Sequence, residues 1–226
     1  MDADAKPSKP LGPFARVLYG FIRSLILGAA KLLGRVEVHG SEHIPSGAFV
    51  LAPVHRSNID FALASLVTKR RLRYMAKDSI WKSKPLGAFV STLGGFPVNR
   101  GAADREALRT CVEVIAAGEP LVMFPEGTRR SGPTVEDLFD GPAYVAAKTQ
   151  VPIVPVGIGG SEAMMPKGAK ILHRSKLVLV VGEPLEPPAR SEGGRTPRRA
   201  VKQLTDQLRG EVQKLFDDAQ TRAGKH

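Results

Sequence analysis

Short apolar runs that alternate with helical patterns are the feature that most constrains the fold of this chain. Ala48–Val54 is a continuous apolar run between Gly47 and His55, as expected for a strand buried on both faces of a sheet. Other strands are predicted at Val36–His39, Leu72–Lys77, Phe96–Val98, Leu121–Phe124, Ile153–Ile158 and Leu177–Val181. Strands that alternate with helices predict an α/β domain with a mostly parallel central sheet flanked by helices.

The segments between the predicted strands carry helical periodicity. Asp104–Ala117 has acidic residues in its first turn and one apolar face, and Gly118 follows it as a stop signal. Ser57 is predicted to cap a helix that runs to about Val67, and a last helix opens at Thr196. The 226 residues suffice for one such domain, which we place at residues 36–226.

Residues 1–35 have a different character, a lead-in followed by an amphipathic segment. Apolar residues recur at three- and four-residue spacing from Phe14 to Leu33, which predicts one or two helices. Such a helix either packs on the protein core or lies in a membrane interface with its basic residues at headgroup level. The longest stretch without a charge, Pro85–Asn99, is only 15 residues long and too short to span a bilayer.

The charge balance points to a polyanionic partner. Lys and Arg total 33 against 22 Asp and Glu, which gives a net charge of +11. Nucleic acid, an anionic membrane and a phosphorylated small molecule all fit this charge. The aromatic content of 6% and the lack of a nucleic-acid-binding motif disfavour nucleic acid. The single cysteine, Cys111, and the lack of zinc-type spacing predict a reducing compartment and no metal site.

Polar clusters follow three of the predicted strands, at the sheet edge where ligands gather in such folds. A carboxylate of Asp60 in the first helical turn could hold one imidazole nitrogen of His55 and leave the other as a general base. Ser57 and Asp60 also have the spacing of a capping box, and Glu126 with Arg129 could form only a salt bridge. The clusters are His55–Asp60, Asn99–Gly101 and Glu126–Ser131.

Four segments of this sequence resemble the boxes of a known family in their order and spacing. The first is an H-x4-D box, and together the four resemble those of the glycerolipid acyltransferases, the PlsC-like lysophosphatidic acid acyltransferase family. The resemblance covers roughly Val36–Pro184. The segments are His55–Asp60, Gly95–Arg100, Phe124–Arg129 and Val151–Val156.

This resemblance implies transfer of a fatty acyl group from acyl-CoA or acyl carrier protein to a hydroxyl of 1-acylglycerol 3-phosphate. His55 is then expected to act as the general base and Asp60 to orient it, with no acyl-enzyme and no cofactor beyond the acyl donor. The substrate-binding residues are expected to be Lys77, Arg100, Glu126, Gly127, Thr128 and Arg129.

A lipid substrate also implies where the protein works. The helical segment Phe14–Leu33 is then favoured as an interfacial anchor on an anionic membrane surface, at the cytoplasmic face of the cell membrane. The same chemistry on another acceptor, such as glycerol 3-phosphate, another lysophospholipid or a glycolipid, is the main alternative. A basic membrane- or nucleic-acid-binding module without catalysis is a further one.

Overall fold

A single seven-stranded sheet organises the molecule. The structure is a computed structural model that describes residues 12–98, 105–166, 168–169, 171–190 and 196–224. Within these residues the strand order is β1-β7-β6-β2-β5-β3-β4, and every neighbouring pair is parallel except β6 and β7. The prediction of a mostly parallel sheet is therefore confirmed. The strands are β1 (Val36–His39), β2 (Val50–Pro53), β3 (Arg73–Lys77), β4 (Gly95–Val98), β5 (Leu121–Val122), β6 (Ile153–Gly159) and β7 (Leu177–Val181).

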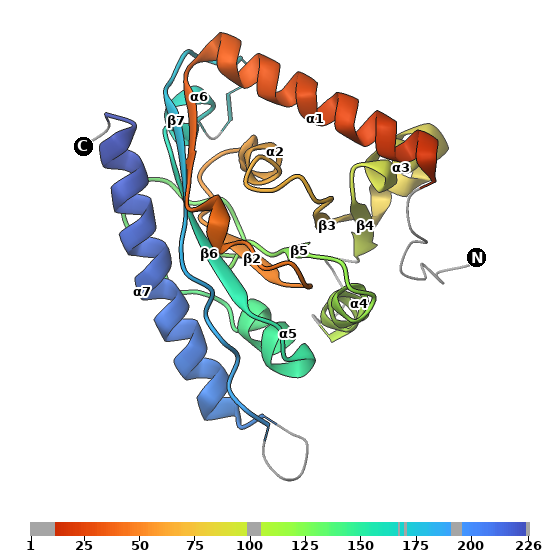
Figure 1. Cartoon of the computed structure of the whole chain (residues 1–226), viewed down its shortest axis with the longest axis vertical. Coiled ribbons are helices and arrows are strands. Elements are labelled where there is room, and N and C mark those ends of the chain that lie inside the picture. Colours follow the sequence, from red (N-terminus) through yellow and green to blue (C-terminus); the bar gives the residue numbers. More distant parts are fainter. Residues whose placement is uncertain (1–11, 99–104, 167, 170, 191–195, 225–226) are drawn as a thin grey trace.

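Helices cover both faces of this sheet (Figure 1). On one side α4 and α5 pack together, and α7 lies against α5, β6 and β7. On the other side lie α2 and α3, with α1 passing over them. The helices are α1 (Pro13–Leu33), α2 (Asp60–Ala64), α3 (Lys84–Thr92), α4 (Arg105–Ala116), α5 (Gly141–Thr149), α6 (Ser161–Met164) and α7 (Arg198–Arg222), with 3₁₀ turns η1 (Ser41–His43) and η2 (Asp78–Lys82).

The sequence predicted a longer second helix than the one observed. The predicted span was Ser57 to about Val67, whereas α2 begins at Asp60. The hydroxyl of Ser57 donates to the carbonyl of Met165, 2.8 Å away, so Ser57 is held by a contact from a distant segment. This tertiary contact keeps the residues before Asp60 in a turn.

Helix α1 is a single continuous helix that shows two kinds of surface. Tyr19 and Ala30 are buried against the body of the protein. Val17, Phe21 and Leu25 are all more than half exposed, although they are large and apolar. Across the described residues, no helix is both long enough and apolar enough to cross a membrane.

Close approach of α7 to β6 depends on glycine. A Cβ atom at Gly157 would lie 2.1 Å from the carbonyl oxygen of Leu215, and one at Gly159 would lie 2.2 Å from that of Ala219. Both distances are far inside van der Waals contact, so the α7 backbone rests directly on the strand. Apolar residues of α7, including Leu208, Val212 and Phe216, complete the core on this side.

We predict that Gly157→Ala destabilises the protein, because the added methyl group forces α7 away from β6. Overpacking of this kind costs about 1–3 kcal/mol. Gly210→Ala is the matched control, since Gly210 is in α7 and a Cβ there meets nothing within 4 Å. That change should stabilise the helix by about 0.5–1 kcal/mol. Urea unfolding measures the change in the free energy of unfolding, which should be negative for Gly157→Ala and positive for Gly210→Ala. Equal changes in the two variants would refute the close packing of α7 on β6.

Candidate active site

The first and third polar clusters meet at a topological switch point of the sheet. Strands β2 and β5 are neighbours, and the chain leaves them in opposite directions. From β2 it passes through α2 to β3, and from β5 it passes through α5 to β6. Ligands bind in the crevice beyond the carboxyl ends of two such strands. His55 follows β2 and Glu126 follows β5, so both lie at this crevice.

The imidazole of His55 is held from two directions. Its Nδ1 lies 3.0 Å from Oδ2 of the fully buried Asp60, and its ring stacks on Phe124 with 4.0 Å between the ring centroids. With the Nδ1 proton directed at the carboxylate, Nε2 keeps the lone pair that a general base needs. The His55 side chain is 18% exposed, so a substrate can reach it.

Asp60 serves the backbone and the histidine at once. Its Oδ2 also accepts hydrogen bonds from the backbone N–H groups of Arg56 and Ser57, each at 2.6 Å. Because α2 begins at Asp60, these bonds order the turn before the helix rather than form a capping box. The sequence allowed either a capping box or a contact with His55, and the structure shows the contact with His55. The Asp60 carboxylate is therefore fixed before any substrate arrives.

Arg56 is a site residue to which sequence analysis assigned no role, as are Phe124 and Arg130. The Arg56 guanidinium is 1% exposed and its Nη1 lies 2.8 and 2.7 Å from the two carboxylate oxygens of Glu126. It also donates to the carbonyls of Gly132 and Thr134, and it lies 4.9 Å from the centre of the Phe216 ring. The only sequence signal was its position beside His55, which says nothing of these distant partners.

Glu126 binds residues of the first cluster rather than Arg129. Besides the pair with Arg56, its Oε2 accepts the backbone N–H of His55 at 3.0 Å. The backbone N–H of Arg130 in turn donates to the carbonyl of His55, also at 3.0 Å. The salt bridge that the sequence allowed between Glu126 and Arg129 is absent from the described contacts. The loop after β5 is instead tied to the histidine itself.

The remaining predicted substrate-binding residues lie around this crevice, with one exception. Lys77 ends β3, next to β5, and is exposed. Gly127 has φ +67°, and a Cβ there would lie 2.7 Å from the Phe139 ring, so this turn requires glycine. Thr128 is exposed and Arg129 is partly exposed. Arg100 lies outside the described residues.

Cys111 has the properties of a core residue. It is fully buried in α4, and burial raises the pKa of its thiol to about 12. The thiolate required of a cysteine nucleophile is therefore scarce at neutral pH. Among the residues that the structure describes, no three His, Cys, Asp or Glu side chains group closely enough to hold a metal ion.

The fold and the site define an α/β enzyme with a histidine–aspartate pair at its switch point. The Acyltransferase family model matches residues 35–159, which is more than half of the chain. The protein therefore belongs to the Acyltransferase family.

Named relatives agree with this assignment. The chain is 29% identical over 172 residues to the 1-acyl-sn-glycerol-3-phosphate acyltransferase of Bacillus subtilis, covering 74% of this chain and 82% of that protein. It is 28% identical over 157 residues to the chloroplastic 1-acyl-sn-glycerol-3-phosphate acyltransferase BAT2 of Brassica napus. That match covers 67% of this chain but only 45% of the plant protein.

A solved structure extends the likeness to three dimensions. The crystal structure of the 1-acyl-sn-glycerophosphate acyltransferase PlsC from Thermotoga maritima superposes with a TM-score of 0.71 at 27% identity. The match covers 89% of this chain and 80% of the other. The family resemblance seen in the four boxes is thus confirmed by both sequence and fold.

We predict that Glu126→Gln destabilises the protein by about 3–5 kcal/mol, because it leaves the buried Arg56 charge without its carboxylate. An amide NH2 would also oppose the donors of Arg56 or His55. Glu136→Gln is the control, since Glu136 pairs with Arg130 at a half-exposed site where such pairs contribute about 1 kcal/mol or less. Urea unfolding compares the two variants, and similar losses would contradict a special role for the buried pair.

Proposed function

We propose that this protein transfers a fatty acyl group from acyl-CoA or acyl carrier protein to the free hydroxyl of 1-acylglycerol 3-phosphate, producing phosphatidic acid for phospholipid synthesis. The observation that carries this proposal is the contact of His55 with the buried Asp60 at the switch point. Family membership supports the acyl-transfer chemistry. The names of the relatives support the acceptor.

In the proposed mechanism His55 is the general base. Nε2 takes the proton of the acceptor hydroxyl as its oxygen attacks the thioester carbon, and Asp60 stabilises the resulting imidazolium. The tetrahedral intermediate then expels the thiolate of the donor, which takes the proton from His55. The acyl group passes directly between substrates, and the buried Cys111 takes no part. No cofactor besides the acyl donor enters this scheme.

We predict that His55→Ala lowers kcat by about 10³-fold or more and that Asp60→Asn lowers it less, because general-base catalysis contributes about 10²–10⁴-fold. The assay is acylation of lysophosphatidic acid by acyl-CoA. His39→Ala is the control, since His39 ends β1 at the edge of the sheet. Turnover within tenfold of wild type in a folded His55→Ala variant would refute the dyad.

The acceptor phosphate is proposed to bind the cations around the crevice. Arg129 offers a planar fork that matches a phosphate, and Lys77 offers a mobile point charge. Lys77 is exposed and Arg129 is partly exposed, so both side chains are available to a ligand. Arg100 is proposed as a third cation. Gly127 and Thr128 form the turn that presents Arg129, and Glu126 contributes by ordering that turn.

We predict that Arg129→Ala raises KM for 1-acylglycerol 3-phosphate by roughly 10–100-fold, the loss expected for a charge-assisted hydrogen bond. KM for a 1-acylglycerol without phosphate should hardly change. Arg109→Ala, an exposed change on α4, is the control. The same assay with glycerol 3-phosphate, other lysophospholipids and glycolipids tests the alternative acceptors. An equal rise in KM for the phosphate-free acceptor would argue against a phosphate contact.

A lipid acceptor requires access to a bilayer, and α1 is proposed to provide it. Val17, Phe21 and Leu25 recur at four-residue spacing and are more than half exposed, which is typical of a helix lying in a membrane interface. The net charge of +11 favours an anionic surface. We propose peripheral attachment at the cytoplasmic face, where acyl-CoA and acyl carrier protein would be met, with no role for nucleic acid.

We predict that Phe21→Ser combined with Leu25→Ser weakens binding to phospholipid vesicles by at least roughly 100-fold, since burial of each side chain contributes about 1.5–3 kcal/mol. Tyr144→Ser is the control, because Tyr144 is also exposed but lies on α5 at the other face of the sheet. Vesicle co-sedimentation measures the effect. Unchanged sedimentation of the double variant would exclude α1 as the anchor.

A further inference from the structure

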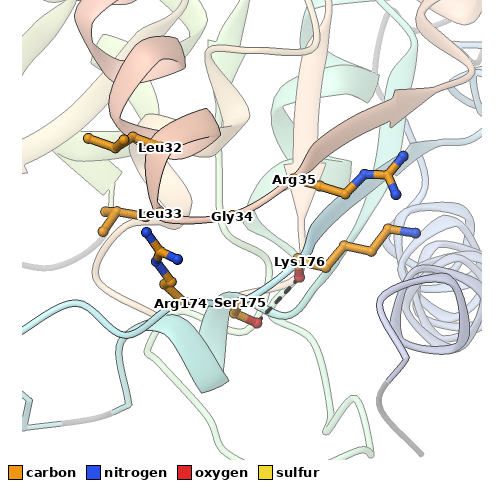
Figure 2. A pocket seen from close by; sticks show the side chains of 7 residues that line it. All are labelled: Leu32, Leu33, Gly34, Arg35, Arg174, Ser175 and Lys176. Carbon is orange, nitrogen blue, oxygen red and sulfur yellow. Dashed lines mark hydrogen bonds between the residues drawn. The ribbon is translucent and has the colours of Figure 1, made fainter.

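Two cavities adjoin α1, and neither is lined by residues of the His55 crevice. The smaller one, about 310 Å³, lies where α1 ends (Figure 2). In Figure 2 the side chains of Arg35 and Lys176 point away from Leu32 and Leu33. Both cations also have Glu37 as a partner, Lys176 at 3.2 Å and Arg35 at 3.9 Å. Charge is therefore partly neutralised in this cavity.

The larger cavity, about 740 Å³, lies between the first half of α1 and the segments that lead into β3 and β5. It therefore adjoins the amino ends of these strands, whereas His55 and Glu126 follow the carboxyl ends of theirs. Residues from three segments line it: Arg16, Tyr19, Gly20, Arg23 and Ser24 of α1, then Lys69, Arg70 and Arg71, then Ala117, Gly118, Glu119 and Pro120. We call this cavity the amino-edge pocket.

The amino-edge pocket has a large excess of positive charge. Five of its lining side chains are cationic and only Glu119 is acidic. Glu119 is itself engaged by Arg73 at 3.0 Å, which lies outside the lining set. Arg23 and Arg70 donate to backbone carbonyls, which fix their guanidinium groups without neutralising them. The positions of these cations are thus preset while their charge remains available.

Arg71 is compensated only in part, because its Nη1 lies 3.9 Å from the Glu119 carboxylate that Arg73 already engages, and its Nη2 donates to the carbonyl of Ser91. Its side chain is 11% exposed, and its Nε is buried with no hydrogen-bond partner among the described residues. Burial, together with the nearby charge of Arg73, lowers the pKa of the Arg71 guanidinium. A buried cation in this state gains from an anion that supplies acceptor oxygens.

The position of the pocket on α1 indicates which anion it takes. At 100° per residue, Gly20 and Ser24 of the pocket adjoin the exposed apolar residues Phe21 and Leu25 on the helix surface. A ligand with a phosphate in the pocket could therefore lay apolar chains along the neighbouring stripe. We propose that the amino-edge pocket binds the phosphate of an anionic phospholipid headgroup, at a second lipid site separate from the acceptor site.

At Gly20 the charge of the pocket can be changed without removing any contact. A Cβ at Gly20 meets nothing within 4 Å, so Gly20→Glu and Gly20→Gln add side chains of equal size at the pocket and remove no contact. Gly28 has the same freedom on α1 but does not line the pocket, so Gly28→Glu and Gly28→Gln control for net charge. Lys69→Gln is an independent variant that removes an exposed cation of the pocket.

The measurement is binding of the full chain to phosphatidylcholine vesicles with and without phosphatidylglycerol. Gly20→Glu should bind the anionic vesicles about fivefold or more weakly than Gly20→Gln, with a smaller difference between the Gly28 variants. Lys69→Gln should weaken binding in the same direction. Neutral vesicles should bind both Gly20 variants equally. Equal binding of the Gly20 pair to anionic vesicles, or an equal charge effect at positions 20 and 28, would overturn the proposal.

Binding of inorganic phosphate distinguishes a lipid headgroup from a soluble phosphate as the ligand of the amino-edge pocket. Phosphate that binds wild type and Gly20→Gln but not Gly20→Glu, while vesicle binding is the same in all variants, would assign the pocket to a soluble phosphate and overturn the lipid site. His55→Ala should bind vesicles as wild type does. The outcome at the pocket is thus independent of whether the proposed acyl transfer is correct.

Discussion

The buried ion pair between Arg56 and Glu126 is the interaction on which the geometry of the site depends. It joins the segment after β2 to the segment after β5 across 70 residues of sequence. A buried pair is stable only if its remaining donors and acceptors are satisfied, and here backbone groups of His55, Gly132 and Thr134 satisfy them. The two segments therefore hold one another, and the His55 backbone is fixed by both.

The residues at the crevice fall into two groups, those that hold His55 and those that a ligand can reach. Asp60 and Phe124 fix the ring of His55, while Glu126 and Arg130 fix its backbone. Both carboxylate oxygens of Glu126 are engaged in these internal contacts. The side chains that a ligand can reach are therefore the exposed or partly exposed ones, those of Lys77, Thr128 and Arg129. Rigid acidic groups at the base and cations at the rim suit the phosphate-bearing acceptor that we propose.

Sequence patterns predicted those strands and contacts that are determined by residues close together in the sequence. The apolar runs located β2, β6 and β7. The five-residue spacing of His55 and Asp60 allowed the contact between them, and the family resemblance favoured it over a capping box. The antiparallel β6–β7 pair and the partner of Arg56 are contacts between distant segments, on which local periodicity carries no information. The short α2 is a related case, since the contact of Ser57 with Met165 decides where that helix begins.

Arg23 of α1 links this helix to the segment that follows α2. Arg23 donates to the carbonyls of Ser65 and Leu66, just past the end of the helix that opens with Asp60. Arg23 precedes residue 35, where the match to the family begins. A truncation at that boundary would leave these carbonyls without their donor. The part of the chain that the family model matches therefore depends on a contact that comes from outside it.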